Sequence, residues 1–406
     1  MLTAGFNTEI ITPFIPVKLS GYAGTREATG VHDDLYARTF VIQSGSNLYS
    51  IVSLDLLSID EALVDYVEKE AKYLGFKKNN IQIVATHTHS GPIGISDTNK
   101  GVMKGYEFFL GEKDDGYLKF VGQQIIESLK KSIDRLASQH IKIGRVEVSG
   151  ISSNRSRPDQ EYDNTLIAIE FENANGEKNL LIRFSNHPTV LPDTNTLITA
   201  DFPSDLYERF ASEYQNVLFM NGACGDISTR YTRESSDFTE LERIGKIMQE
   251  KIEESLSNPA FAGEFDTVQF ETTKIKALTK EPGDFNKLER HYDGVEDEQE
   301  RISIYAEMMY AKYQTQREIE LPVSVMKIHD LIFVLMPVEI FSTLTLNYIE
   351  EDIYYTSFAN GYYTYLPDSL SYDYNEYEAR VSPFMKGEGE RVIEEVQEWI
   401  EGLDAD

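Results

Sequence analysis

The chain has 406 residues, of which 68 are Asp or Glu and 38 are Lys or Arg, and its formal net charge is −30. Such an acidic protein is ill suited to nucleic acid, whose phosphates need Lys and Arg for neutralisation, and anionic bilayers repel it. We therefore expect no nucleic-acid partner and no stable membrane association. Hydrophobic residues make up 41% of the chain, enough for a packed core, and the length permits one large layered domain or two smaller ones.

The cysteine content and the amino terminus bear on where the protein works. Cys224 is the only cysteine, so no internal disulfide is possible. The first residues, Met1 to Gly5, lead directly into the chain without the basic and apolar regions of a secretory signal. No stretch approaches the roughly 18 apolar residues of a membrane span. The expected location is the cytoplasm, and the sequence leaves the oligomeric state unknown.

Strand-like and helix-like segments alternate along the chain. In the first two thirds, alternating patterns and short apolar runs predict strands, and apolar residues at helical spacing predict helices. In chain order these are strands 36–43 and 48–56, helix 60–74, strand 81–85, helix 118–136, strands 141–148, 166–172, 180–184 and 217–220, and helix 244–252.

A second block begins near residue 262. It comprises strand 268–275, an acidic helical stretch 284–313, strands 323–328 and 331–336, helix 339–348, strand 354–358 and a C-terminal amphipathic helix containing Trp399. We find no internal repeat, and no linker long enough to separate independent domains. The sequence therefore predicts a single α/β domain over residues 1–406, built in layers.

The most informative motif is the run Ala85-Thr86-His87-Thr88-His89-Ser90-Gly91-Pro92, which closes the predicted strand 81–85. Alternate side chains of a strand point to the same side, so His87 and His89 are expected to face one cavity. Imidazole nitrogens held on a rigid strand suit a zinc site at the mouth of a sheet. A pair of hydrogen-bonded loop histidines would explain the motif equally well.

Other predicted strands are also followed by polar residues, which are unfavourable in an apolar core. His187 follows strand 180–184, Ser228 follows strand 217–220, Glu339 follows strand 331–336 and Tyr362 follows strand 354–358. Loops at one edge of the sheets of a layered fold converge on the active site. Each residue has a structural explanation by itself, such as a helix first-turn acid for Glu339. As a set, His87, His187, Glu339 and Tyr362 could fill a zinc shell between them.

These residues resemble the neutral (alkaline, non-lysosomal) ceramidases, in their catalytic amino-terminal domain. The resemblance implies two mixed β-sheets flanked by helices, and it covers nearly the whole chain. Its blocks, in the family's order, are Ala4–Phe6 with Ile10–Pro13, Gly21–Ala23, His32–Asp33 with Tyr36–Arg38, His87–Pro92, Asn154–Ser156, Asn186–Thr189, Ala200–Pro203, Gly225–Ser228, Pro337–Glu339 and Asn360–Tyr362.

The resemblance also implies roles for individual residues. The zinc ligands would be His87, His187, Glu339 and Tyr362, and His89 would face the substrate rather than the metal. Zinc would lower the pKa of a bound water to roughly 7 and polarise a carbonyl, while His89 or a Tyr hydroxyl would stabilise the oxyanion. The remaining residues would hold or line the substrate: Arg155 would bind a polar or anionic group, and Tyr365 and Tyr377 would form the cleft.

Three departures from the family concern the substrate rather than the metal. Thr229-Arg230 replaces the family's Pro-Asn after Ser228, and Leu366–Ser369 replaces a Thr-Thr-x-Glu-Glu-Tyr block. The family's C-terminal immunoglobulin-like domain has no expected counterpart after the Trp399 helix. We therefore expect a zinc-dependent amidohydrolase that cleaves the amide of a small soluble N-acyl compound rather than of membrane ceramide.

Two alternatives remain at this stage. Ser228 could act as a nucleophile with His89 as its base, in an amidase without catalytic zinc. The chain could instead be a metal-binding protein without turnover. Removal of the metal distinguishes the first alternative, because a serine enzyme should survive chelation.

Overall fold

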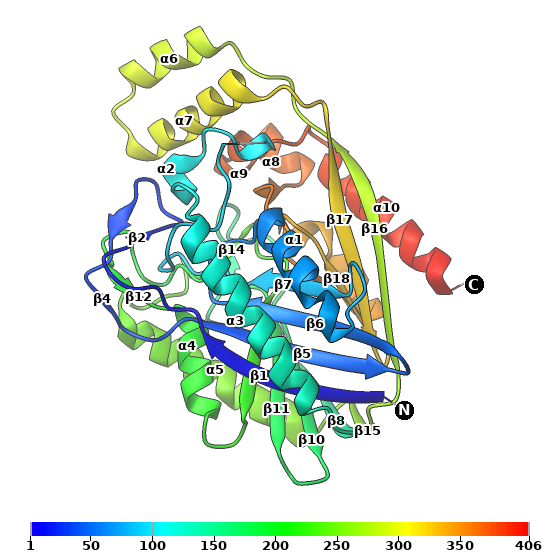
Figure 1. Ribbon diagram of the computed structural model, residues 1–406. Coiled ribbons are helices and arrows are strands. Elements are labelled where there is room, and N and C mark those ends of the chain that lie inside the picture. Colours follow the sequence, from blue (N-terminus) through cyan, green and yellow to red (C-terminus); the bar gives the residue numbers. More distant parts are fainter. Residues whose placement is uncertain (1, 100, 405–406) are drawn as a thin grey trace.

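Three mixed β-sheets form the interior of the protein (Figure 1), which the computed structural model describes over residues 2–99 and 101–404. The first sheet contains, in spatial order, β1 (Leu2–Ile10), β5 (Tyr36–Ser44), β6 (Asn47–Leu54) and β7 (Ile81–Ala85). The second contains β13 (Asn216–Asn221), β11 (Lys178–Phe184), β10 (Thr165–Asn173), β8 (Gln139–Glu147) and β15 (Phe261–Glu264). The third contains β16 (Val268–Leu278), β17 (Glu318–Ile328), β18 (Leu331–Leu335) and β20 (Ile353–Thr356).

The three sheets repeat one topology that the sequence analysis did not detect. In each sheet three successive strands pair antiparallel, and a fourth strand then pairs parallel with the third. The parallel pairs are β6 with β7, β11 with β13, and β18 with β20. Since parallel strands end at the same sheet edge, the loops that follow them gather there. These loops carry His87, His187, Glu339 and Tyr362.

Helices cover the outer faces of the sheets (Figure 1). The first sheet is covered by α1 (Glu61–Glu70) and α3 (Asp115–Asp134), the second by α4 (Phe202–Phe210) and α5 (Phe238–Ser257), and the third by α10 (Glu388–Asp404). The inner faces share one hydrophobic cluster, to which Phe40, Phe171 and Phe333 contribute from the three sheets in turn. This shared core fixes the sheet edges relative to one another. In the described part of the chain no helix is long and apolar enough to cross a membrane.

Four two-stranded pairs join the loops between these layers. They are β2 (Lys18–Leu19) with β3 (Arg26–Glu27), β4 (Gly30–Val31) with β12 (Leu197–Ile198), β9 (Ser153–Asn154) with β14 (Ile227–Ser228), and β19 (Glu339–Ile340) with β21 (Tyr365–Leu366). Three short helices also lie in the loops: α2 (Glu107–Leu110), α8 (Ser369–Asp373) and α9 (Tyr377–Val381).

The acidic stretch 284–313 is two helices rather than one. It forms α6 (Phe285–Gly294) and α7 (Glu298–Tyr313), the pair at the top of Figure 1. Asp297 begins α7 by accepting a hydrogen bond from the Glu300 amide at 2.8 Å, which is N-capping. Arg380 of α9 then binds Glu300 at 2.6 Å and Glu307 at 2.9 Å, so that α7 is held against the segment carrying Tyr377.

The layered α/β class predicted from the sequence is confirmed, with three larger sheets among the described residues where the resemblance implied two. The strands and long helices also fall close to their predicted positions. The predicted helix 339–348 is wrong, because β19 occupies its start and short 3₁₀ segments, Ser342–Leu344 and Leu346–Glu351, follow. The Glu339 amide donates to Thr364 O at 2.8 Å, and Ser342 N donates to Asp226 at 2.6 Å. These long-range bonds hold the backbone extended, so Glu339 is not a helix first-turn acid.

Candidate active site

His87 takes its position from a strained turn rather than from strand alternation. Strand β7 ends at Ala85, and His87 has φ of 73°, in the left-handed region that residues with a side chain rarely adopt. Its amide donates to Leu56 O at 2.9 Å, and its ring stacks on Phe358 with centroids 3.9 Å apart. Both contacts fix the ring, so the reason predicted for the shared orientation of His87 and His89 is wrong.

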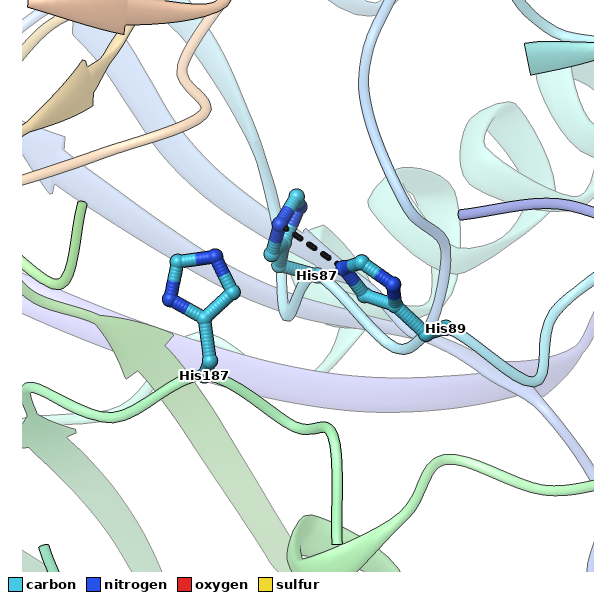
Figure 2. Close-up of side chains that lie close together, drawn as sticks. All are labelled: His87, His89 and His187. Atoms are coloured by element: carbon cyan, nitrogen blue, oxygen red, sulfur yellow. Dashed lines mark hydrogen bonds between the residues drawn. The ribbon is translucent and has the colours of Figure 1, made fainter. Parts of the chain in front are cut away.

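Three histidines converge at the common edge of the first two sheets (Figure 2). The rings of His87 and His187 lie with centroids 4.9 Å apart, and the Nε2 atoms of His87 and His89 are 3.2 Å apart. One ring nitrogen of each of the three histidines can be chosen so that all lie within 4.8 Å of one another. This spacing is compatible with three nitrogens around a single metal ion.

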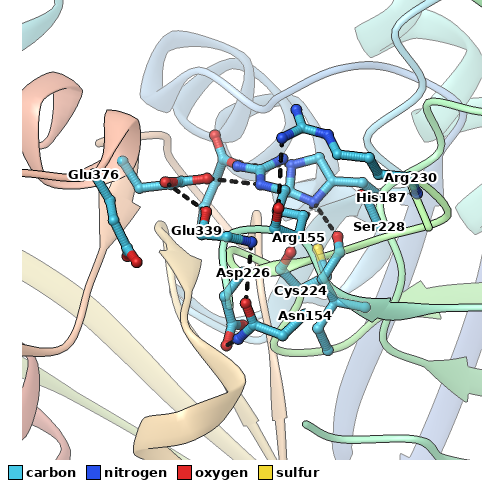
Figure 3. Close-up of polar contacts among 12 residues, drawn as sticks. Asn154, Arg155, His187, Cys224, Asp226, Ser228, Arg230, Glu339 and Glu376 are labelled. Carbon is cyan, nitrogen blue, oxygen red and sulfur yellow. Dashed lines mark hydrogen bonds and ion pairs between the residues drawn. The ribbon is translucent and has the colours of Figure 1, made fainter. Parts of the chain in front are cut away.

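Backbone carbonyls set the tautomers of two of these histidines. His87 Nδ1 lies 2.7 Å from Leu57 O, and His187 Nδ1 lies 2.7 Å from Cys224 O (Figure 3). A carbonyl oxygen can only accept, so each Nδ1 carries the hydrogen and each Nε2 is a bare lone pair. This arrangement, with the remote nitrogen bonded to a carbonyl, is typical of metal-binding histidines.

Glu339 and Tyr362 complete the set that the sequence predicted. Glu339 Oε2 lies 3.1 Å from His187 Nε2 and 3.5 Å from His87 Nε2. The other carboxylate oxygen of Glu339 accepts a hydrogen bond from the Tyr362 hydroxyl. Two nitrogen lone pairs therefore face a carboxylate oxygen, which is unfavourable unless a cation or a proton lies between them. A two-nitrogen, two-oxygen donor set of this kind fits zinc.

The ionisation of the centre follows from its burial. The side chains of His87, His187 and Glu339 are at most 2% exposed. Burial lowers the pKa of His87 to about 3, against the opposing charge of Glu339, and it lowers the pKa of His187 well below the usual value. Burial, and then the charge of Glu339, raises the pKa of the Tyr362 hydroxyl. Both histidines are thus neutral near pH 7, the form that binds a metal.

A cavity of about 600 Å³ opens beside the histidine cluster. All five residues that the resemblance assigned to the substrate side line this cavity: His89, Arg155, Ser228, Tyr365 and Tyr377. Helix α7 closes part of it through Gln299, Glu300 and Ser303. The buried Nδ1 of His89 has no hydrogen-bond partner among the described residues. His89 therefore belongs both to the cluster and to the cavity wall.

Arg155 is held in this wall by an acid that sequence reasoning did not assign to the site. Arg155 Nε donates to Glu378 Oε1 at 2.7 Å, and the two side chains are 11% and 3% exposed. The guanidinium carbon of Arg155 lies 5.3 Å from the centre of the Tyr365 ring, a cation–π contact. Its buried Nη2 has no partner among the described residues. The sequence signal for Glu378 was the resemblance of Tyr377-Glu378 to the end of the family's Thr-Thr-x-Glu-Glu-Tyr block.

Ser228 lies in the cavity wall without a base. Its Oγ accepts a hydrogen bond from the Arg230 amide at 3.2 Å, and the hydrogen bonds found in the described residues do not join it to His89. The neighbouring Asp226 is buried and accepts bonds from Asn154 Nδ2 at 2.9 Å and from the Ser342 amide at 2.6 Å. Asp226, which the sequence reasoning did not single out as a site residue, thus ties the Ser228 loop to the segment after Glu339 (Figure 3).

A mixed α/β fold with a buried histidine cluster at its sheet edges defines the class of the protein, and comparison with known proteins defines its family. The sequence profile of neutral/alkaline non-lysosomal ceramidases, N-terminal domain, matches residues 4–217. The protein therefore belongs to this family. The matched stretch contains His87, His89, Arg155 and His187, whereas Ser228, Glu339, Tyr362, Tyr365 and Tyr377 lie beyond it.

Individual relatives agree with this assignment. The chain is 31% identical over 207 residues to the neutral ceramidase of Pseudomonas aeruginosa, covering 46% of this chain and 30% of that protein. It is 26% identical over 227 residues to neutral ceramidase A of Dictyostelium discoideum, covering 50% of this chain and 31% of that protein. The matched region thus spans about a third of the length of these curated relatives.

The fold is similar over a much larger part of the chain. The crystal structure of the Pseudomonas aeruginosa neutral ceramidase matches with a TM-score of 0.76 and 18% identity, over 97% of this chain and 73% of that one. A ceramidase complexed with C2 matches with a TM-score of 0.75 and 18% identity, over 97% of this chain and 74% of that one. The similarity of fold therefore extends well beyond residue 217, where the match to the family profile ends.

Proposed function

We propose that the protein is a zinc-dependent amidohydrolase that cleaves the N-acyl amide bond of a small soluble compound. The observation that carries this proposal is the meeting of two bare histidine nitrogens and the Glu339 carboxylate, all buried, beside a substrate-sized cavity. Membership of the ceramidase family supports amide hydrolysis as the reaction. The cavity volume of about 600 Å³ lies within the usual range for small-molecule sites.

His87, His187, Glu339 and Tyr362 would hold the metal in this proposal. His89 is the competing ligand, because its Nε2 lies only 3.2 Å from that of His87. When bound, zinc supplies a water of lowered pKa, near 7, and a Lewis acid for the amide carbonyl. The donor set is buried and the carbonyls of Leu57 and Cys224 orient it, as expected of ligands arranged before the metal binds.

The other cavity residues would bind and orient the substrate. Arg155, fixed by Glu378, offers its unpaired Nη2 to a polar group next to the amide. His89 and Tyr365 are neutral because burial lowers the pKa of His89 and raises the pKa of Tyr365, so the Tyr365 hydroxyl can donate a hydrogen bond to the developing oxyanion. Hydrolysis consumes one water and releases a carboxylic acid and an amine.

The proposed preference for a soluble substrate rests on charge. A protein with a net charge of −30 is repelled by the anionic bilayers in which membrane lipids reside. Ceramide presented in detergent is the natural comparison, because the family is named for ceramide hydrolysis. Higher kcat/KM for detergent-dispersed ceramide than for water-soluble N-acyl amino acids or amino sugars would contradict this part of the proposal and leave the rest intact.

Metal analysis combined with a hydrolysis assay tests the proposal as a whole. The purified protein should contain about one zinc per chain, lose hydrolysis of N-acyl compounds on treatment with a chelator, and regain it when zinc is added back. Activity that survives complete removal of metal would contradict the metal mechanism and favour Ser228 as a nucleophile. Zinc bound without hydrolysis of any N-acyl compound would favour a metal-binding protein without turnover.

A further inference from the structure

Two arginines line the outer part of the cavity without an acidic partner. Arg230 Nη1 reaches Arg155 O at 3.4 Å, and Arg233 Nη1 reaches Thr189 O at 3.3 Å. Both side chains are exposed, and the ion pairs found among the described residues include neither of them. In a chain with a net charge of −30, two uncompensated guanidinium groups at one cavity stand out.

Most other charges of this cavity are already satisfied by one another. Arg155 is paired with Glu378 at 2.7 Å, and Arg380 is paired with Glu300 at 2.6 Å. The Asp297 carboxylate accepts a hydrogen bond from the Glu300 amide at the start of α7. The remaining acid, Asp193, acts electrostatically on Arg26 and, like Arg233, on Tyr22. Arg230 and Arg233 are therefore the two guanidinium groups of this cavity that the ion pairs found among the described residues leave without a carboxylate.

The unpaired charge lies close to the candidate reacting centre. Arg230 follows Ser228 by two residues, donates its amide to the Ser228 hydroxyl at 3.2 Å and contacts the backbone of Arg155. Figure 3 shows Arg155, Ser228 and Arg230 grouped beside His187. Deeper in the same wall, the buried Nη2 of Arg155 has no partner among the described residues. An anionic group at these donors would lie next to an amide held at the histidine cluster.

We propose that Arg230 and Arg233, together with Arg155, recognise a carboxylate, and that the preferred substrates are N-acyl amino acids. This inference rests on the proposed amide hydrolysis and names its substrate class. The planar fork of an arginine matches the two oxygens of a carboxylate, which favours bidentate binding. Phosphonate and phosphate offer similar oxygens, but they carry a second negative charge into a cavity that Asp193, Asp297 and Glu300 also line.

The experiment compares matched substrates that differ only in the charged group. The substrates are an N-acyl amino acid, its carboxamide and its phosphonate analogue, all with the same acyl chain. For the wild-type protein, we expect kcat/KM to be about tenfold or more higher for the carboxylate than for the carboxamide. This difference corresponds to the stability that a hydrogen bond gains when its partner is charged. The advantage should shrink as salt is raised, because Arg230 and Arg233 are exposed.

The double variant Arg230→Gln/Arg233→Gln should bring the ratio of carboxylate to carboxamide close to one, mainly through a higher KM for the carboxylate. Arg145→Gln is the matched control for a single lost charge, since Arg145 is paired with Asp352 at 2.9 Å and does not line the cavity. Its ratio should equal that of the wild type. Circular dichroism of each variant checks that the fold is retained.

Several outcomes would overturn this inference while leaving amide hydrolysis in place. These are equal kcat/KM for carboxylate and carboxamide in the wild type, a ratio that the double variant does not change, or a preference for the phosphonate. If no compound is hydrolysed, the proposed function is wrong. Carboxylate recognition can then be tested separately, by measuring the affinity of the zinc-loaded protein for the N-acyl amino acid with calorimetry. Binding that the double variant weakens about tenfold would support it, and absence of binding would overturn it.

Discussion

The histidine centre and the outer cavity wall are built in different ways. His87, His187 and Glu339 follow strands of three different sheets and are almost fully buried. Main-chain carbonyls orient the two histidine rings, and Tyr362 and His187 contact the Glu339 carboxylate. The outer wall is formed by loops, by the short helix α9 and by the start of α7, and its arginines reach solvent or pair with acids of α7 and α9. In the proposed function, this difference would let the sheet edges position the metal ligands while the loops and helices of the wall select the substrate.

The repeated sheet topology explains why the inner region is so well defined. In each sheet a parallel pair ends at the edge where a ligand candidate follows, and the three inner faces share one core. The strands that precede the candidates pack against aromatic side chains such as Phe40 and Phe171, and this close packing limits how far the strand ends can shift. The outer wall is held instead by ion pairs between side chains, such as Arg155 with Glu378 and Arg380 with Glu300.

The largest expected effect comes from removing an inner ligand. His187→Ala should abolish both zinc binding and hydrolysis, because the protein then loses one nitrogen ligand and the carbonyl-oriented geometry around it. Zinc content by elemental analysis and kcat on an N-acyl compound check this result. A zinc content equal to that of the wild type would show that the ligand assignment is wrong.

His89→Ala separates the centre from the cavity wall. If His89 faces the substrate, the variant should keep its zinc and lose on the order of 10²–10³ in kcat, the usual cost of one oxyanion donor. Zinc content and kcat measured on the same preparation check both parts. Loss of zinc would instead assign His89 to the metal, in a set with His87 and His187.

The pair that joins the two regions should matter for stability. Glu378→Ala leaves the Arg155 guanidinium, only 11% exposed, without its carboxylate, which we expect to cost about 3 kcal/mol of unfolding free energy. The double variant Arg155→Met/Glu378→Ala should recover part of that loss, because no uncompensated charge remains. Urea unfolding of the three proteins measures the difference, and equal stability of Glu378→Ala and wild type would contradict a structural role for the pair.

We also expect the stability of the protein to depend on pH through Asp226. Burial raises the pKa of this carboxyl from 3.8 to about 7, so between these values the folded state binds a proton that the unfolded state has released. The contribution is therefore fully present below about pH 4 and is lost as pH rises to about 7, with a slope of up to about 1.4 kcal/mol per pH unit.

Asp226→Asn tests this dependence because it keeps the size of the side chain and one oxygen for the bond from Asn154. The variant should lose less unfolding free energy than the wild type between pH 4 and 7, as measured by urea unfolding at a series of pH values. Parallel profiles for the two proteins would show that Asp226 remains ionised in the folded state.

Much of the local structure and the identity of the central residues could be predicted from the sequence. Two strand-like segments joined by the turn 44–47 located strands β5 and β6, and apolar residues at helical spacing located helix α3, because these signals are local in the sequence. The His87–Pro92 run and the ordered blocks indicated the ceramidase family, and the family match is confirmed. The roles of the individual site residues stay predictions until they are tested.

The tertiary structure decided what depends on contacts between distant segments. Glu339 is extended rather than helical because Thr364 and Asp226 bind the main chain on either side of it, and no local pattern records those partners. The same holds for the arginines of the cavity. Arg155 is paired because Glu378, far away in the chain, folds next to it, and Arg230 is unpaired because no acid of a distant segment does so among the described residues. The periodicity of a sequence shows which residues of an element are buried. Which side chains of different elements come into contact depends on how the three sheets pack against one another.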